Sequence, residues 1–303
     1  MKKILQKAFP KKFGSFWKKF RNSANFDDEL KFISDLFIES ESYNYVSNQW
    51  HILNIISYES ILKNGIEKYG SEISTHYFTF NDYKSEYLKN LFKKIDDSKI
   101  INLKTDIFKK QDNFDYKNSI LYNYLCLLLY ENLKLTEYYK YFNHLNDKTF
   151  LGFNDPYITI DNFKVSSDKI ISLFDLEKIN SFYKIKENNK ILEIGAGSGR
   201  LADCILSIKN NINYTICDIP PSIYISYKRL KRAFPEKKIK LLIDCENPEK
   251  LNDDIEKNQI SFVFPHQLNK INSNFFDITL AVDCLHEMDK KTLKRYFEFV
   301  NKI

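Results

Sequence analysis

The spacing of hydrophobic residues along the chain changes near residue 189. Before that point, apolar side chains recur every three or four positions, which is the spacing of one helix face, as in Leu30, Ile33, Leu36 and Phe37. After it, short apolar runs alternate with segments of helical spacing. The pattern predicts an all-helical N-terminal domain at 27–150, a connector at 151–188 and an α/β domain at 189–303.

Within the helical region, the run NSILYNYLCLLLYENLKLTEYYKYF at 118–142 predicts one long buried helix. Gly65 and Gly70 stand where helices are expected to end, because glycine readily adopts the left-handed conformation that closes a helix. In the connector, turn formers of the stretch GFNDP precede an extended segment. Ser167 is predicted to cap the helix that follows it.

The C-terminal region has the alternation typical of a parallel sheet. Apolar runs predict strands at 190–194, 213–219, 238–243, 260–264 and 276–282. Helical spacing follows the first two of these strands, at 200–208 and 222–234. Right-handed crossovers between such strands place helices on both faces of the sheet. The predicted fold class is therefore α/β, a Rossmann-like parallel sheet preceded by an all-helical domain.

A glycine-rich turn, ILEIGAGSGR, joins the first predicted strand to the first predicted helix of this region. It holds three of the chain's seven glycines, Gly195, Gly197 and Gly199. Such a turn presents backbone N–H groups and a helix N-terminus to a ligand. The dinucleotide pattern GxGxxG is not met, because Arg200 stands where its last glycine would be.

Two acids near this turn indicate which ligand it would take. Glu193 precedes the first glycine by two residues, and a carboxylate there disfavours a pyrophosphate and favours a cationic ligand such as S-adenosylmethionine. Asp218 ends the second predicted strand, 23 residues after Gly195, where an acid accepts the hydroxyls of a ribose. The alternative is a structural turn that holds no ligand.

The loop ILEIGAGSGR together with Asp218 resembles the class I methyltransferases that use S-adenosylmethionine. Upstream, WHILNIISYESILKNGIEKYGSEISTHYF and GFNDPYITIDNFKVSSDKI are similar to the helical N-terminal region of bacterial sugar O-methyltransferases of surface-glycan clusters. Downstream, CDIPPSIYISYKRL, ISFVFPHQL and FFDITLAVDCLHEM resemble the methyltransferase half of that family. The resemblance covers about residues 40–303, and its cofactor loop is its most specific part.

This resemblance implies an O-methyltransferase that uses S-adenosylmethionine and acts on a sugar hydroxyl in surface polysaccharide biosynthesis. His286 is expected to be the general base, since it follows the strand predicted beside the glycine strand, and Glu287 is expected to orient its ring. A histidine that begins a helix and moves no proton is the alternative reading. The acceptor is expected to be a sugar or glycan precursor.

For the adenine end of the cofactor, the interpretation favours His266 and Gln267, which follow the strand at 260–264. If the strand at 238–243 is the adenine-side strand instead, Asp244 takes that place. Asp283 is expected at the methionine end. The expected cofactor contacts are Glu193, Gly195, Ala196, Gly197, Gly199, Asp218, Ile219, His266, Gln267 and Asp283.

The basic residues are concentrated at the start of the chain. Of 46 basic residues eight lie in residues 1–21, without an acid, so 38 remain against 40 acidic residues in the rest of the chain. A nearly balanced body argues against nucleic-acid binding. The arm at 1–26 is amphipathic as well as basic, which predicts peripheral contact with an anionic membrane or packing on the body.

The remaining composition indicates the compartment. The five cysteines form no CxxC pair, which favours a reducing cytoplasm over disulfides or zinc, and no metal site is expected. The chain contains no run of about 18 apolar residues, so no membrane span is predicted. The expected location is cytoplasmic, at the inner membrane face if the basic arm binds lipid.

Class I methyltransferases have three further strands after the one predicted at 276–282, and the 21 residues that follow it, DCLHEMDKKTLKRYFEFVNKI, are too few for them. The domain at 189–303 is therefore expected to be incomplete at its C-terminus or closed differently. An apolar strand left at the sheet edge predicts homo-oligomers or poor solubility.

Other functions stay open. The same enzyme class with a non-sugar small-molecule acceptor is one. A catalytically inactive protein that binds S-adenosylmethionine, or a regulatory protein, is another. An NAD-dependent enzyme ranks third, because Glu193 and Arg200 both disfavour it.

Overall fold

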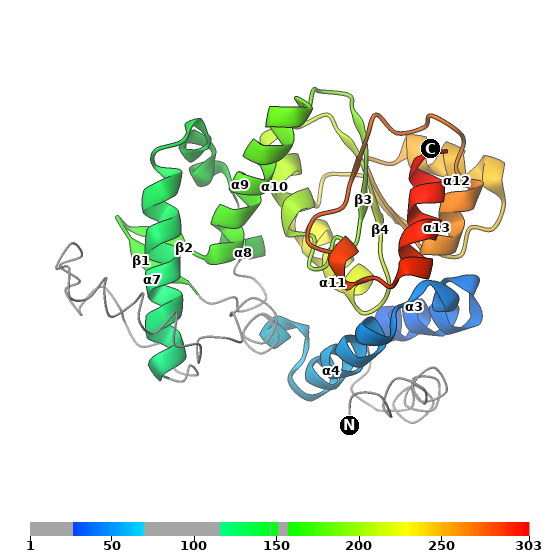
Figure 1. The fold of residues 1–303 in the computed structure, drawn as a ribbon, viewed down its shortest axis with the longest axis horizontal. Helices are drawn as coiled ribbons and strands as arrows, with labels where there is room; N and C mark the ends of the chain where they lie inside the picture. The colour runs from blue at the N-terminus through cyan, green and yellow to red at the C-terminus, as the bar shows by residue number, and fades with distance from the viewer. Residues whose placement is uncertain (1–26, 70–115, 146, 151–156, 303) are drawn as a thin grey trace.

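The computed structural model describes residues 27–69, 116–145, 147–150 and 157–302. Its centre is a five-stranded parallel sheet with the order β5-β6-β4-β3-β7 (Figure 1). The strands are β3 (Lys190–Ile194), β4 (Asn213–Cys217), β5 (Ile239–Leu241), β6 (Ile260–Val263) and β7 (Ile278–Leu280). The predicted α/β class and the parallel sheet are confirmed.

Helices connect these strands. They are α10 (Arg200–Ile208), α11 (Ser222–Ala233), α12 (Pro248–Lys257), α13 (Lys290–Val300) and the 3₁₀ turns η6 (Pro265–Lys270) and η7 (Leu285–Glu287). The described residues from 27 to 150 are helical, as predicted. They form α3 (Asp28–Glu39), η1 (Glu41–Tyr45), α4 (Asn48–Asn64), η2 (Ile66–Lys68), α7 (Tyr116–Leu133), η5 (Glu137–His144) and α8 (Asp147–Phe150). The connector adds the antiparallel hairpin of β1 (Ile158–Ile160) and β2 (Phe163–Val165), then α9 (Ser167–Phe182).

Alternation of side chains along β3 explains why both faces of the sheet are covered. Ile191 and Glu193 point to one face, and Leu192 and Ile194 to the other. The first face packs on α9, α10 and α11, and the second on α12, η6 and α13. All four residues are buried, so β3 lies at the centre of the fold with helices on either side.

The order of the strands shows which strands lie beside β3 and β4 and which lie at the edges of the sheet. β7 pairs with β3 in parallel, as expected for the strand that leads to His286. β6 lies next to β4, whereas β5 lies at the edge beyond it. Among the described residues β7 pairs with β3 alone, so it is a sheet edge there, as predicted.

Two local predictions need correction, and one helix was not predicted. The helix expected at 118–142 ends at Leu133, because the Thr136 hydroxyl donates to the Leu133 carbonyl and accepts from Tyr138 N–H, which starts η5 instead. Ser166, not Ser167, caps α9, since its hydroxyl accepts from Lys169 N–H. Helix α12, in which Pro248 occupies the first turn after the cap Asn247, was not predicted.

The N-terminal helices α3 and α4 lie across the carboxyl ends of β3 and β4 (Figure 1). Charged and phenolic side chains join them to α11: Tyr224 donates to Asp27 at 2.9 Å, and Lys228 bonds to Glu29. Arg232 reaches Glu67 beyond α4, at 2.5 Å. The N-terminal helices are therefore positioned by the α/β domain and not only by their own packing.

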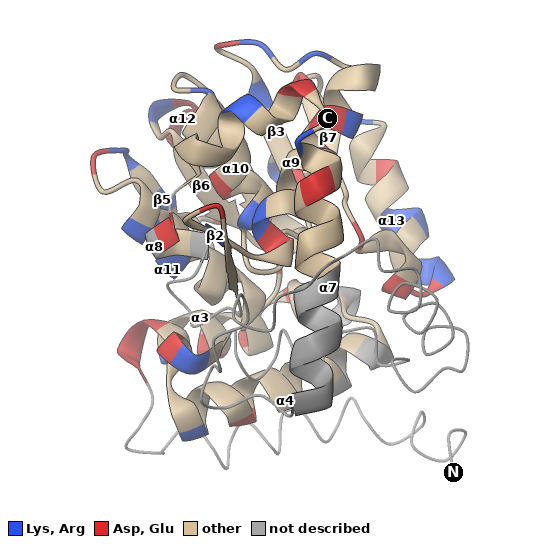
Figure 2. Cartoon of the chain, turned by 90° about the vertical axis from the view of Figure 1, so that its left-hand side faces the viewer, with Lys and Arg blue, Asp and Glu red and all other residues tan. Residues whose placement is uncertain are grey.

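Charges of both signs are interspersed over the described elements (Figure 2). None of the helices in the described part of the chain is both long and apolar enough to cross a membrane. The basic arm at 1–26, which carries the prediction of peripheral membrane contact, lies outside the described residues.

Candidate functional site

The glycine turn between β3 and α10 is packed tightly from two sides. A Cβ on Gly195, whose φ is 70°, would lie 2.6 Å from the Cβ of Cys284. A Cβ on Gly199 would lie 2.9 Å from the Cβ of Ser226 in α11. These two glycines are therefore required by the close approach of other segments. A Cβ on Gly197 would meet nothing within 4 Å, so this residue faces open space.

A buried ion pair supports the turn from behind. Arg229 of α11 and Asp203 of α10 are both fully buried, and Arg229 Nε lies 3.3 Å from Asp203 Oδ2. The same guanidinium donates to the Ser198 hydroxyl at 3.0 Å. The charge pair thus fixes the middle of the turn relative to both helices that follow it.

Asp218 stands directly beside the turn. Its Oδ2 accepts from Gly197 N–H at 2.8 Å, and its Oδ1 accepts from Ile219 N–H at 2.7 Å. Burial raises the pKa of Asp218 to about 7, although these two hydrogen bonds act in the opposite direction. Each carboxyl oxygen keeps a lone pair for another donor, such as a ribose hydroxyl.

A pocket opens between the turn and the N-terminal helices. It lies at the carboxyl ends of β3 and β4, which is where open parallel sheets bind ligands. Its lining residues are Val46, Ser47, Trp50, Gly195, Gly197, Cys217, Asp218, Ile219, Cys284, Met288 and Tyr296. Of these, Gly195, Gly197, Asp218 and Ile219 were predicted as cofactor contacts.

Glu193 is not among the lining residues. It shares a face with Ile191, and there its Oε2 accepts from the Tyr214 hydroxyl at 2.8 Å. Burial raises the pKa of Glu193 to about 7, and the charge of Arg200 partly offsets this. The carboxyl group therefore lies beneath the turn, on the α10 side of the sheet, and any effect of its charge on a ligand is indirect.

Arg200 opens α10 and turns toward α9. Its guanidinium donates to Asp175 Oδ2 at 2.7 Å and to the Ser172 hydroxyl at 3.2 Å. Asp283 Oδ2 lies 3.7 Å from the same guanidinium. The side chain at the place of the third dinucleotide glycine therefore joins the connector helix to the site.

The predicted catalytic residues lie beside the pocket and do not line it. His286 and Glu287 are in η7, with His286 Nε2 and Glu287 Oε1 3.8 Å apart. The His286 side chain is 70% exposed, and that of Asp283 is 78% exposed. Cys284 is the residue of this segment that enters the site, where its Sγ donates to the Ile194 carbonyl at 3.1 Å.

The two residues predicted at the adenine, His266 and Gln267, make hydrogen bonds to other parts of the protein. Gln267 is fully buried, and its amide donates to the carbonyls of Leu242 and Cys245 and accepts from Phe264 N–H. His266 is bonded to Ser42 of η1 and to Glu246. Neither lines the pocket. The alternative Asp244 follows the edge strand β5 and is not a lining residue either.

Sequence reasoning missed the pocket wall opposite the turn. Val46, Ser47 and Trp50 come from the N-terminal helices, and Met288 and Tyr296 from the segment after β7. Among the described residues, no cluster of His, Cys, Asp and Glu could hold a metal ion.

No protein-family model matches this chain, and no curated protein is significantly similar to it.

We expect Gly195→Ala to lower the free energy of unfolding by roughly 2–5 kcal/mol, from left-handed strain and overlap with Cys284. Gly197→Ala should cost only the strain, about 1–2 kcal/mol, because its Cβ meets nothing. Urea unfolding of the two variants measures the difference. Cys284→Gly should restore part of the loss in Gly195→Ala, and equal losses in both glycine variants would refute the packing argument.

Proposed function

We propose that the protein is an S-adenosylmethionine-dependent O-methyltransferase that acts on a sugar hydroxyl in surface polysaccharide biosynthesis. The observation that carries the cofactor assignment is the charge of the pocket. Among the described lining residues Asp218 is the one acid, and none is Lys, Arg or His. Such a site favours a cationic nucleoside over a pyrophosphate-bearing dinucleotide.

The residues present fit this cofactor. Asp218 would accept the ribose hydroxyls, and the open side of Gly197 gives room for close approach to the backbone. Trp50 and Tyr296 offer aromatic faces, which attract a cation. When bound, the cofactor supplies a methyl group on a positively charged sulfur.

This methyl group would pass to the acceptor oxygen, and the electron pair of the broken carbon–sulfur bond would stay on the sulfur. The acceptor hydroxyl must also lose its proton. His286 is the proposed acceptor of this proton, with Glu287 beside its ring. The sugar identity rests on the sequence resemblance alone.

One alternative has a specific observation in its favour. His286 is 70% exposed and stands outside the pocket wall, as expected for a protein that binds S-adenosylmethionine without catalysing transfer.

Contact of residues 1–21 with the inner membrane face is a further proposal, which would bring the enzyme to a lipid-linked acceptor.

Isothermal titration calorimetry tests the cofactor assignment. The chain should bind S-adenosylhomocysteine with a Kd well below 1 mM and should not bind NAD at the same concentration. Asp218→Ala should weaken this binding by about 10- to 100-fold, because a hydrogen bond to a charged group is lost. Asp253→Ala, which removes an exposed partner of Lys257, is the control. Tighter binding of NAD would overturn the assignment.

Affinity for S-adenosylhomocysteine should rise with pH and level off above about 7, because the ribose hydroxyls donate to ionised Asp218. Below that point Kd should change by up to about tenfold per pH unit. Calorimetry between pH 5.5 and 8.5 measures the profile. In Asp218→Asn the profile should flatten.

Because burial raises the pKa of Asp218 and of Glu193, the free energy of unfolding should fall as pH rises from about 4 to about 7.

His286→Ala should leave the Kd of S-adenosylhomocysteine unchanged and reduce turnover by about 10²-fold or more if His286 is the base. Mass analysis of products made with a panel of candidate sugars, nucleotide-linked sugars and phenols measures turnover. Unchanged turnover would remove His286 from the mechanism. Absence of product from wild type that binds the cofactor favours the non-catalytic alternative.

A further inference from the structure

One short stretch of the N-terminal region, residues 42–50, forms part of the pocket wall opposite the glycine turn and is here called the cover segment. Val46, Ser47 and Trp50 of this segment line the pocket together with Gly197 and Asp218. It runs from η1 into the first turn of α4, whose N-cap is Ser47. A ligand in this pocket would therefore lie between the glycine turn and the cover segment.

One end of the cover segment is bonded to the segment that carries the predicted base. The Ser47 hydroxyl donates to the carbonyl of Glu287 at 3.1 Å. This contact joins the start of α4 to η7 beside the pocket that Ser47 lines.

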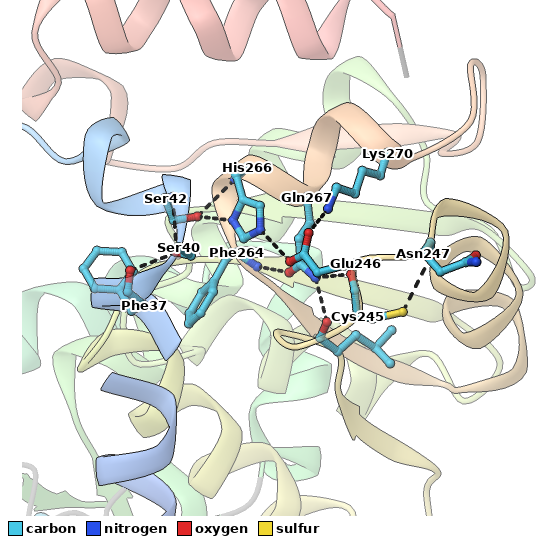
Figure 3. A network of polar contacts seen from close by, with 11 residues as sticks. Phe37, Ser40, Ser42, Cys245, Glu246, Asn247, Phe264, His266, Gln267 and Lys270 are labelled. Carbon is cyan, nitrogen blue, oxygen red and sulfur yellow. Dashed lines mark hydrogen bonds and ion pairs between the residues drawn. The ribbon is translucent and has the colours of Figure 1, made fainter. Parts of the chain in front are cut away.

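The other end is held by a row of three side chains (Figure 3). The Ser42 hydroxyl lies 2.7 Å from His266 Nδ1, and His266 Nε2 lies 3.1 Å from Glu246 Oε1. Ser42 is completely buried and His266 almost so. The three residues come from η1, η6 and the segment between β5 and α12, so the row joins the cover segment to the sheet domain.

Hydrogen-bond accounting favours one arrangement of protons in this row. Ser42 Oγ already accepts from the backbone N–H of His266 at 3.1 Å. The hydroxyl proton is then best donated to His266 Nδ1, which leaves Nε2–H to donate to the Glu246 carboxylate. In this state every polar atom of the Ser42 and His266 side chains has a partner.

The sheet side of this contact is rigid. Gln267, next to His266, bonds to Leu242, Cys245 and Phe264. Lys270 binds the second oxygen of Glu246, and this contact together with that of His266 lowers the pKa of the Glu246 carboxyl, although burial opposes it. His266 and Glu246 are therefore held in place, and Ser42 is the member that belongs to another part of the chain.

A serine, a histidine and a carboxylate in series are also the parts of a nucleophilic triad. Here Ser42 is closed off from solvent, and its oxygen accepts from a backbone N–H. A substrate could not reach it without separation of the cover segment from the sheet domain. The row is thus suited to fastening and not to nucleophilic attack.

We propose that His266 is a positioning residue that, with Ser42 and Glu246, fastens the cover segment over the cofactor pocket and sets how fast a nucleoside ligand leaves it. The identity of that ligand rests on the proposed function, but the fastening does not. The side chain that reports the state of the cover segment is Trp50, which lines the pocket.

The test uses tryptophan fluorescence, since the chain has two tryptophans and Trp17→Phe leaves Trp50 alone. In this background, stopped-flow mixing with S-adenosylhomocysteine gives the association and dissociation rates. Ser42→Ala and His266→Ala should raise the dissociation rate about 5- to 50-fold, as expected for loss of a buried hydrogen bond. His266→Asn, which keeps a polar atom toward Ser42, should recover part of the difference.

Two variants guard against loss of folding as the cause. Glu246→Gln changes a side chain that is 65% exposed, and should give a smaller change of the same sign. Asp253→Ala removes an exposed ion pair elsewhere and should change neither rate. Urea unfolding of each variant shows whether it remains folded under the assay conditions.

Acrylamide quenching of Trp50 without any ligand provides an independent measurement. Quenching should increase in Ser42→Ala and His266→Ala, because the cover segment separates more often from the sheet domain. Unchanged quenching and unchanged dissociation rates in folded variants would overturn the fastening role. If wild type binds no S-adenosylhomocysteine but quenching rises as expected, the proposed cofactor fails and the fastening stands.

Discussion

The site depends on how closely three chain segments approach one another around the glycine turn. Gly195 lies against Cys284 after β7, and Gly199 lies against Ser226 of α11, with too little room for a Cβ at either place. These contacts bring the ends of β3 and β7 and the start of α10 to one point. The buried pair of Arg229 and Asp203 holds the same turn from below. Gly197 is the one of the three glycines at which a Cβ would meet nothing within 4 Å.

The parts of the fold that could be predicted from the sequence are those fixed by local pattern. β3, its glycine turn and α10 follow from an apolar run, three glycines and a helical repeat within 19 residues, 190–208. Asp218 could be placed beside the turn for a similar reason, because carboxyl ends of adjacent parallel strands share an edge. Break points such as the one at Thr136 were missed, since an apolar run continues across them.

The parts that the sequence could not predict depend on which element covers which face of the sheet. Alternation in β3 puts Glu193 on the face of Ile191, but only the packing of α10 and the position of Tyr214 turn that face into a closed interior. His266 follows the strand next to β4, where an adenine contact is reasonable. The sequence does not reveal that the His266 ring is hydrogen-bonded to Ser42, which lies over two hundred residues earlier in the chain. Long-range side-chain contacts of this kind have no local pattern.

Glu193 was predicted as a cofactor contact but does not line the pocket. The reason for proposing this cofactor therefore changes, whereas the proposed cofactor stays the same. The proposed preference for a cation rests instead on Asp218, in a pocket wall whose described residues include no Lys, Arg or His. Burial that raises the pKa of Asp218 to about 7 also means that this charge is costly until a ligand offers donors to it. A cover segment that excludes water strengthens that dependence, because hydrogen bonds and charges interact more strongly where water is absent. Residues of the N-terminal helices and Asp218 of the sheet domain line the same pocket, so neither half of the chain forms the candidate site alone.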